Sequence, residues 1–69
     1  MNGVALRVNG EPLSVPPSTT VRLLMEQLGA ARDGVAVAVN DRLVLRSSWD
    51  ATELRDDDRV EVLTAAPGG

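Results

Sequence analysis

The sequence predicts a small α+β domain in which a mixed sheet of four to five strands packs on one helix. Short segments of alternating apolar residues lie near both ends of the chain and in its middle, which is typical of strands with one buried face. A single stretch with helical spacing lies between them, so one helix is expected to cover one face of one sheet. We expect residues 1–63 to form this domain and residues 64–69 to form a flexible, extended tail.

A hairpin is predicted at the start of the chain. Its first strand places three apolar residues on one face: Val4, Leu6 and Val8. Asn9-Gly10 then favours a tight turn with positive φ, and the alternation resumes over Leu13, Ser14 and Val15. Pro16-Pro17 ends the return strand because proline has no N–H to donate to a ladder.

The next segment predicts a short helix over residues 21–28. Ser18, Thr19 and Thr20 offer hydroxyls suited to its N-cap. Four residues form one apolar stripe with helical spacing: Val21, Leu24, Met25 and Leu28. Gly29 stands where a left-handed residue would end the helix. Because so short a helix is marginal alone, we expect its stripe to pack on the sheet.

The second half of the chain predicts the remaining strands. Residues 35–39 alternate Val with Ala, Asn40-Asp41 is predicted to form the next turn, and residues 43–45 read as a short partner strand. Residues 59–63 form the last strand, with Val60 and Val62 inward. Ser47-Ser48 is expected to cap a single helical turn between them, after which Leu54 returns to the core. We expect the first and last strands to pair in parallel at the centre of the sheet.

Two features of this half have both a structural and a functional interpretation. Trp49 is expected to cover one end of the core, with contact to a partner as the alternative. Asp56-Asp57-Asp58 lacks the spacing of a calcium loop, so we interpret it as a solvated turn, with contact to basic residues of a partner as a further option.

Composition argues against catalysis by this chain. The 69 residues include no His, no Cys and no Lys, which removes the usual nucleophiles, general bases and zinc ligands. We therefore expect no catalytic residue, no metal site and no bound cofactor. The net charge of −3 disfavours nucleic-acid binding. With no signal-like segment and no apolar run of membrane-spanning length, we expect a cytoplasmic protein.

The tail ends in Gly68-Gly69, and its carboxylate is the group that we interpret as reactive. Glycine has no Cβ, so the backbone of Gly68 and Gly69 can enter a narrow active site and adopt torsions closed to other residues. Pro67 restricts the chain ahead of them toward extended conformations. The assigned roles are modification for Gly69 and threading for Pro67 and Gly68; a frayed terminus without a role is the alternative.

Several of these segments resemble the sulfur carriers of the ThiS type, which share the ubiquitin-like β-grasp fold. The resemblance lies in Val8-Asn9-Gly10-Glu11, Thr19-Thr20-Val21, Leu28-Gly29, residues 35–40, Arg46-Ser47-Ser48-Trp49, Asp58-Arg59-Val60-Glu61 and Gly68-Gly69. Two positions depart from the pattern: Asp57 stands where a glycine is usual, and Pro67 where another glycine or a bulkier residue is frequent.

The resemblance implies a carrier that is itself a substrate and not an enzyme. A ThiF-like, E1-type adenylyltransferase would use ATP to adenylate Gly69, and sulfur from a donor such as a cysteine desulfurase would replace AMP to give a thiocarboxylate. A ThiG-like thiazole synthase would then accept the sulfur in thiamine biosynthesis. The alternatives are a MoaD-like subunit of molybdopterin synthase, a carrier for another sulfur pathway, a ubiquitin-like modifier of proteins, and a non-covalent binding module.

A docking surface is predicted on the outer face of the sheet, away from the helix. Its members are small or apolar residues expected to point outward: Ala5, Ala36, Ala38 and Leu63. An apolar patch beside the tail is suited to a partner protein. The alternative is that these residues only fill an Ala-rich chain.

Overall fold

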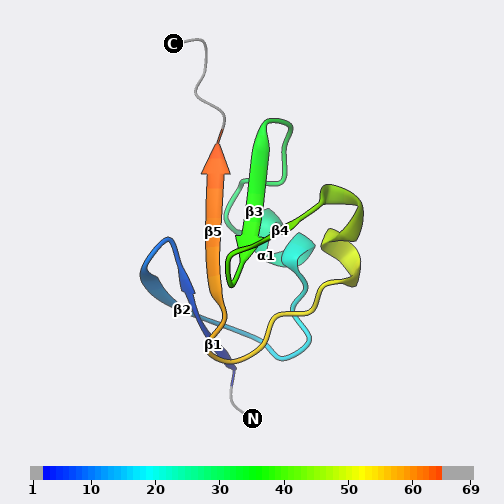
Figure 1. The fold of residues 1–69 in the computed structure, drawn as a ribbon. Helices are drawn as coiled ribbons and strands as arrows, with labels where there is room; N and C mark the ends of the chain where they lie inside the picture. Colours follow the sequence, from blue (N-terminus) through cyan, green and yellow to red (C-terminus); the bar gives the residue numbers. More distant parts are fainter. Residues whose placement is uncertain (1–2, 65–69) are drawn as a thin grey trace.

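The computed structural model describes residues 3–64, which form one five-stranded mixed sheet with a helix on one face (Figure 1). The strands are β1 (Val4–Val8), β2 (Glu11–Val15), β3 (Val35–Val39), β4 (Arg42–Val44) and β5 (Arg59–Thr64), and the helices are α1 (Val21–Gln27) and the 3-10 helix η1 (Arg46–Ala51). The order across the sheet is β2-β1-β5-β3-β4. β1 and β5 are parallel neighbours at the centre, as the sequence predicts.

The opening hairpin forms with the predicted turn. Asn9 and Gly10 have φ values of 52° and 85°, so both adopt the left-handed conformation that a two-residue hairpin turn needs. β2 begins at Glu11, two residues earlier than predicted, and includes Pro12. The proline is tolerated because β2 lies at the edge of the sheet, where one side of the strand has no ladder to maintain.

Helix α1 begins as predicted, because the Thr20 hydroxyl accepts a hydrogen bond from the Leu23 amide at 3.2 Å. Val21, Leu24 and Met25 are fully buried. Leu28 was expected on the same stripe, but it is the C-cap and is 41% exposed. Gly29, with φ of 71°, turns the chain away at this point, so the last stripe position leaves the core.

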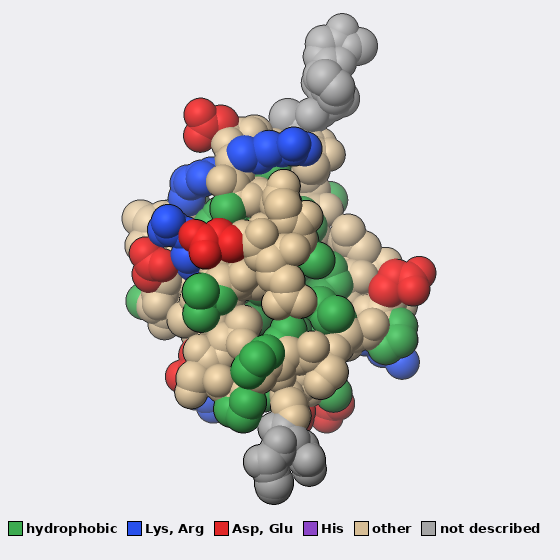
Figure 2. All heavy atoms as spheres, turned by 180° about the vertical axis from the view of Figure 1, so that it is seen from behind, with side chains coloured by type: hydrophobic (Ala, Val, Ile, Leu, Met, Phe, Trp, Pro, Cys, Tyr) green, Lys and Arg blue, Asp and Glu red, His purple; other side chains and the backbone are tan. Residues whose placement is uncertain are grey.

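On the solvent side of α1, Arg22 links the helix to η1. Its Nε donates to Glu26 at 2.9 Å, and its guanidinium also contacts Asp50 at 3.4 Å. The hydrogen bond to Glu26, with the charge of Asp50, raises the pKa of Arg22. The helix side of the molecule shows hydrophobic side chains at several places, with acidic and basic side chains around them (Figure 2).

The helical turn predicted around Trp49 is a 3-10 helix. The prediction that Ser47-Ser48 caps this turn is wrong. η1 starts at Arg46 after an extended Leu45, and no side chain caps it. Its position is fixed instead by Trp49, which is 2% exposed and donates from Nε1 to the Val44 carbonyl at 3.1 Å. The Arg46 guanidinium lies 4.7 Å from the centroid of the Trp49 ring. Trp49 therefore covers the core, as predicted.

The core lies between α1 and the inner face of the sheet. Its buried apolar residues are Leu6, Val15, Val21, Leu24, Met25, Val37, Trp49, Leu54 and Val60. Leu54 returns to the core as predicted, and its amide bonds the Thr19 carbonyl at 2.9 Å beside the start of α1. Because the helix occupies one face, the other face of the sheet remains open to solvent (Figure 1).

Candidate functional site

The residues assigned to chemistry lie outside the described residues. This holds for Gly69, Gly68 and Pro67. What the structure describes is the strand that leads to them: β5 runs through Thr64, one residue past the predicted domain boundary at residue 63. Because β1 and β5 are parallel, the chain enters the sheet at one end of the molecule and β5 ends at the opposite end (Figure 1).

The end of β5 lies beside apolar residues on the outer face. Ala36 and Leu63 are cross-strand partners, and Ala38 pairs with Leu43 on β4. Alternation of side chains puts these four on the same face, opposite the buried Val37. Leu63 and Leu43 are 59% and 64% exposed. We call Ala36, Ala38, Leu43 and Leu63 the tail-side patch.

Ala5 shares this face but not this location. The parallel register pairs Arg7 with Arg59, so Ala5 lies level with residue 57, before β5 begins. The Asp57 amide accordingly bonds the Ala5 carbonyl at 2.7 Å. Leu63 is four residues further along β5 than Arg59, so the structure separates Ala5 from the three other predicted docking residues.

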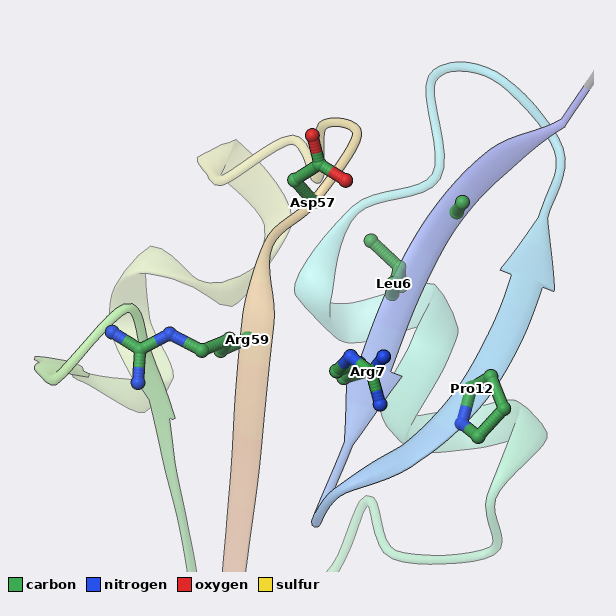
Figure 3. Close-up of a pocket in the computed structure, with 6 residues that line it drawn as sticks. Leu6, Arg7, Pro12, Asp57 and Arg59 are labelled. Atoms are coloured by element: carbon green, nitrogen blue, oxygen red, sulfur yellow. The ribbon is translucent and has the colours of Figure 1, made fainter.

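A shallow pocket of about 390 Å³ lies at the Ala5 end, between β2, β1 and the start of β5 (Figure 3). It is lined by Ala5, Leu6, Arg7, Pro12, Asp57 and Arg59. Arg59 points away from Arg7 and pairs with Asp41 at 3.0 Å (Figure 3). This pocket lies near the start of β5, at the other end of the strand from Leu63 and Thr64. Among residues 3–64, no cluster of three or more acidic, His or Cys side chains is arranged to hold a metal ion.

The three aspartates before β5 form hydrogen bonds within the fold. Asp58 accepts from the Arg55 amide and from Asn40 Nδ2, each at 2.8 Å. Asp56 accepts from the Ala5 amide at 2.8 Å. Asp57 has φ of 70°, a conformation that favours the glycine usual at this position. The turn is therefore built into the sheet, a role beyond the solvated one predicted.

Sequence reasoning missed three residues that shape this site. Leu43 was placed on a strand but not on a face, although its pairing with Ala38 would follow from the alternation of β3 and β4. Asn9 and Asn40 were interpreted as turn residues alone. Each also bonds the main chain of β5 through its side chain, from opposite sides. The repeated Val-Asn at the ends of β1 and β3 was the available signal.

No helix within residues 3–64 has the length and apolar character needed to cross a membrane.

Comparisons with known proteins show which family and which solved structures the chain resembles. The model of the ThiS family matches residues 2–69. A crystal structure of the thiamine biosynthesis protein ThiS from Geobacter metallireducens superimposes with a TM-score of 0.81 and 36% identity, covering 96% of this chain and 100% of that one.

Curated relatives agree with this match. The sulfur carrier protein ThiS of Thermus thermophilus is 36% identical over 62 residues, which is 90% of this chain and 95% of the relative. A thiazole synthase of Magnetococcus marinus is 38% identical over 64 residues, which is 93% of this chain but 20% of that enzyme. One segment of a larger synthase therefore resembles the whole domain described above.

Proposed function

The chain belongs to the ThiS family and is a sulfur carrier of thiamine biosynthesis, and we propose that it carries the sulfur as a thiocarboxylate on Gly69. The observation that carries this proposal is the family match, which extends through Gly69 and so includes the Gly-Gly pair. The structure supports it by placing the strand that leads to this pair at the centre of a well-packed sheet.

Activation of Gly69 is proposed to proceed in two steps on a partner enzyme. A carboxylate oxygen of Gly69 attacks the α-phosphorus of ATP, and pyrophosphate leaves. A sulfur nucleophile then attacks the acyl carbon of the adenylate, and AMP leaves with the electrons of the broken C–O bond. The adenylate is needed because a carboxylate by itself would have to expel oxide. If the nucleophile is a persulfide of the donor, the product is an acyl disulfide; a thiol then attacks its donor-side sulfur, so that the thiocarboxylate leaves and a disulfide forms between that thiol and the donor.

The carrier's own contribution is presentation and not catalysis. The sequence has no His, Cys or Lys to act as base or nucleophile. In this proposal ATP is bound by a ThiF-like adenylyltransferase and not by this chain. The tail-side patch lies beside the end of β5, where a partner that takes up the tail would also contact Leu63 and Ala36. We also propose a cytoplasmic location.

The proposed acceptor is a ThiG-like thiazole synthase, and the proposed donor is a cysteine desulfurase. Support for the acceptor comes from the synthase that carries a segment like this chain, since linkage in one protein keeps carrier and acceptor at high effective concentration.

Intact mass spectrometry tests the proposal. The chain is incubated with a ThiF-like adenylyltransferase, ATP and a sulfur source, beside a variant that lacks Gly69. We expect a mass increase equal to the replacement of one oxygen by sulfur, in the full chain alone. An unchanged full chain, with an enzyme that thiolates another ThiS protein, would contradict the proposal.

A further inference from the structure

Two asparagines, Asn9 and Asn40, hold β5 from opposite sides in the same local conformation. Each follows a valine at the end of a strand that flanks β5, and their φ values are 52° and 53°. Asn40 acts at the beginning of β5, and Asn9 acts closer to its end. We propose that Asn9 is a positioning residue for activation of the carrier, because its carboxamide holds the last part of β5 in the form that the adenylyltransferase binds. This role rests on the proposed function, in which that enzyme is the partner.

The main chain of Asn9 continues the parallel ladder between β1 and β5 by one hydrogen bond. Its amide donates to the Val60 carbonyl at 2.8 Å, as the Arg7 amide donates to the Asp58 carbonyl at 3.0 Å. In a regular parallel ladder, the carbonyl of the same residue then accepts from the amide two positions further along the partner strand. For Asn9 that amide belongs to Val62.

The side chain of Asn9 supplies this acceptor in place of its carbonyl. With φ of 52°, Asn9 turns the main chain out of the strand and into the hairpin turn with Gly10, beside β5 (Figure 1). Its Oδ1 accepts from the Val62 amide at 2.9 Å, and its Nδ2 lies 3.5 Å from the Val62 carbonyl. The carboxamide therefore fills the places that the main chain of β1 would fill if the strand continued.

The hairpin turn alone does not require this carboxamide. A two-residue turn of this kind needs positive φ at both central positions, and glycine meets that need as well as asparagine does. Glycine has no side chain, so it would form the turn and leave the Val62 amide without an acceptor. Asparagine at position 9 thus meets two demands, and the second concerns β5 and not the hairpin.

Among residues 3–64, the Val62 amide depends on Asn9. In an antiparallel pair, alternate residues bond the neighbouring strand. The Asn40 amide donates to the Arg59 carbonyl at 2.8 Å, which assigns the bonds toward β3 to the odd-numbered residues of β5. Val62 is even-numbered and faces β1. Loss of the Asn9 carboxamide would leave residues 62–64 bonded to β3 alone.

Holding this segment on both sides favours binding by the partner and does not take part in the chemistry. A strand held on one side samples more conformations, and a partner that binds it must supply the free energy to order it. The reacting atoms and the groups of the enzyme are the same with or without the carboxamide. A loss at Asn9 should therefore raise KM for the carrier and leave kcat unchanged.

Glycine substitution at the two asparagines provides a matched pair of variants. Glycine adopts positive φ at low cost, so both variants keep their turns. Asn9→Gly removes the acceptor of the Val62 amide. Asn40→Gly removes the acceptor of the Arg59 amide at 2.9 Å and the donor to Asp58 at 2.8 Å, so it should cost at least as much stability. Asn9→Asp keeps an acceptor for Val62 and is the conservative variant.

The variants are compared by adenylation kinetics with a ThiF-like enzyme, and their stability by urea unfolding. We expect Asn9→Gly to raise KM for the carrier about fivefold with kcat unchanged. Asn40→Gly should keep KM within about twofold of the unchanged chain despite its lower stability. Asn9→Asp should restore most of the lost affinity. An unchanged KM in Asn9→Gly, an equal rise in both glycine variants, or a fall in kcat alone would overturn the positioning role.

Amide hydrogen exchange of the free chain gives a second readout that needs no enzyme. The Val62 amide should exchange about tenfold faster in Asn9→Gly than in the unchanged chain, and Asn40→Gly should leave it protected. Equal protection of Val62 in Asn9→Gly and the unchanged chain would overturn the inference.

Calorimetric binding to the same enzyme without ATP separates this role from sulfur transfer. The affinities should follow the order of the KM values, and their measurement needs no turnover. A chain that binds in this order and is never thiolated refutes the proposed function alone. A chain that is thiolated with the same KM in every variant refutes the role of Asn9 alone.

Discussion

At its beginning, β5 is bonded on both sides, by side chains as well as by main chain. Asn40 Oδ1 accepts from the Arg59 amide at 2.9 Å, and the Asp58 carbonyl accepts from the Arg7 amide at 3.0 Å. At its end, Leu63 and Thr64 are paired with β3, and among the described residues no strand is paired with them on the other side. One strand therefore has a fixed start and an end with an open side.

The difference between the two ends of β5 explains how a small domain can present a tail to a partner without enclosing a substrate in a pocket of its own. The bonds at the beginning of β5 determine its position and register relative to β1 and β3. The open side at its end leaves main-chain groups for a partner. If this division is correct, substitutions at the beginning should change stability, and substitutions at the end should change recognition.

The largest stability effect is expected from Val60→Ala near the beginning of β5. Val60 is 1% exposed, and truncating it leaves a cavity against the helix, so the free energy of unfolding should fall by roughly 2 kcal/mol. Leu63→Ala at the exposed end should change it by less than about 0.5 kcal/mol. Urea unfolding of both variants checks the contrast. Similar losses in the two would mean that the end of β5 is as firmly packed as its beginning.

Removing the Asp58 carboxylate should produce the next largest change. Asp58→Ala leaves the Arg55 amide and Asn40 Nδ2 without their acceptor, which should lower the free energy of unfolding by about 1–2 kcal/mol. Asp33→Ala is the matched control, because Asp33 is exposed and its side chain accepts no hydrogen bond from the described residues. Thermal unfolding of the pair gives the difference. Equal unfolding temperatures would refute the structural role of the turn.

Recognition at the end of β5 is tested by introducing a charge into the tail-side patch. Ala36→Arg places a guanidinium beside Leu63, so kcat/KM for thiolation should fall about tenfold while the fold is retained. Ala5→Arg places the same charge on the same face but at the other end of the sheet, and should leave thiolation unchanged. If both variants lose activity equally, the partner covers the whole outer face, as the sequence alone predicts.

The smallest effect is expected from Asp41→Asn. This change removes the ion pair with Arg59, whose partners are largely exposed, so stability should change by less than about 0.5 kcal/mol. Chemical denaturation at low salt checks this value. A loss above 1 kcal/mol would show that the exposed ion pair, and not the Asn40 and Asp58 side chains, anchors the beginning of β5.

Most of the fold was predictable because it follows from local patterns. The Asn9-Gly10 turn, the Thr20 cap and the buried stripe from Val21 to Met25 each depend on neighbouring residues. The central pairing of β1 with β5 followed from the need to cover one helix with one sheet. Leu28 and the start of η1 differed, because tertiary packing around Gly29 and Trp49 decides where those helices end and begin.

The site was less predictable because its members meet through long-range register. Ala5 and Ala36 look alike in sequence, and the parallel register of β1 with β5 places Ala5 at the far end. The Asn9 carboxamide reaches Val62, 53 residues away, to end the ladder. The role of Gly69 came from the sequence and the resemblance, since it lies outside the described residues.

Transfer of labelled sulfur tests the central claim most directly. The chain is prepared with a thiocarboxylate of isotopically heavy sulfur at Gly69 and is supplied as the one sulfur source to a thiazole synthase with its other substrates. The account predicts that the thiazole product carries the heavy isotope and that the chain returns to its carboxylate mass. Unlabelled product, or no product from a synthase that works with another ThiS thiocarboxylate, would contradict it.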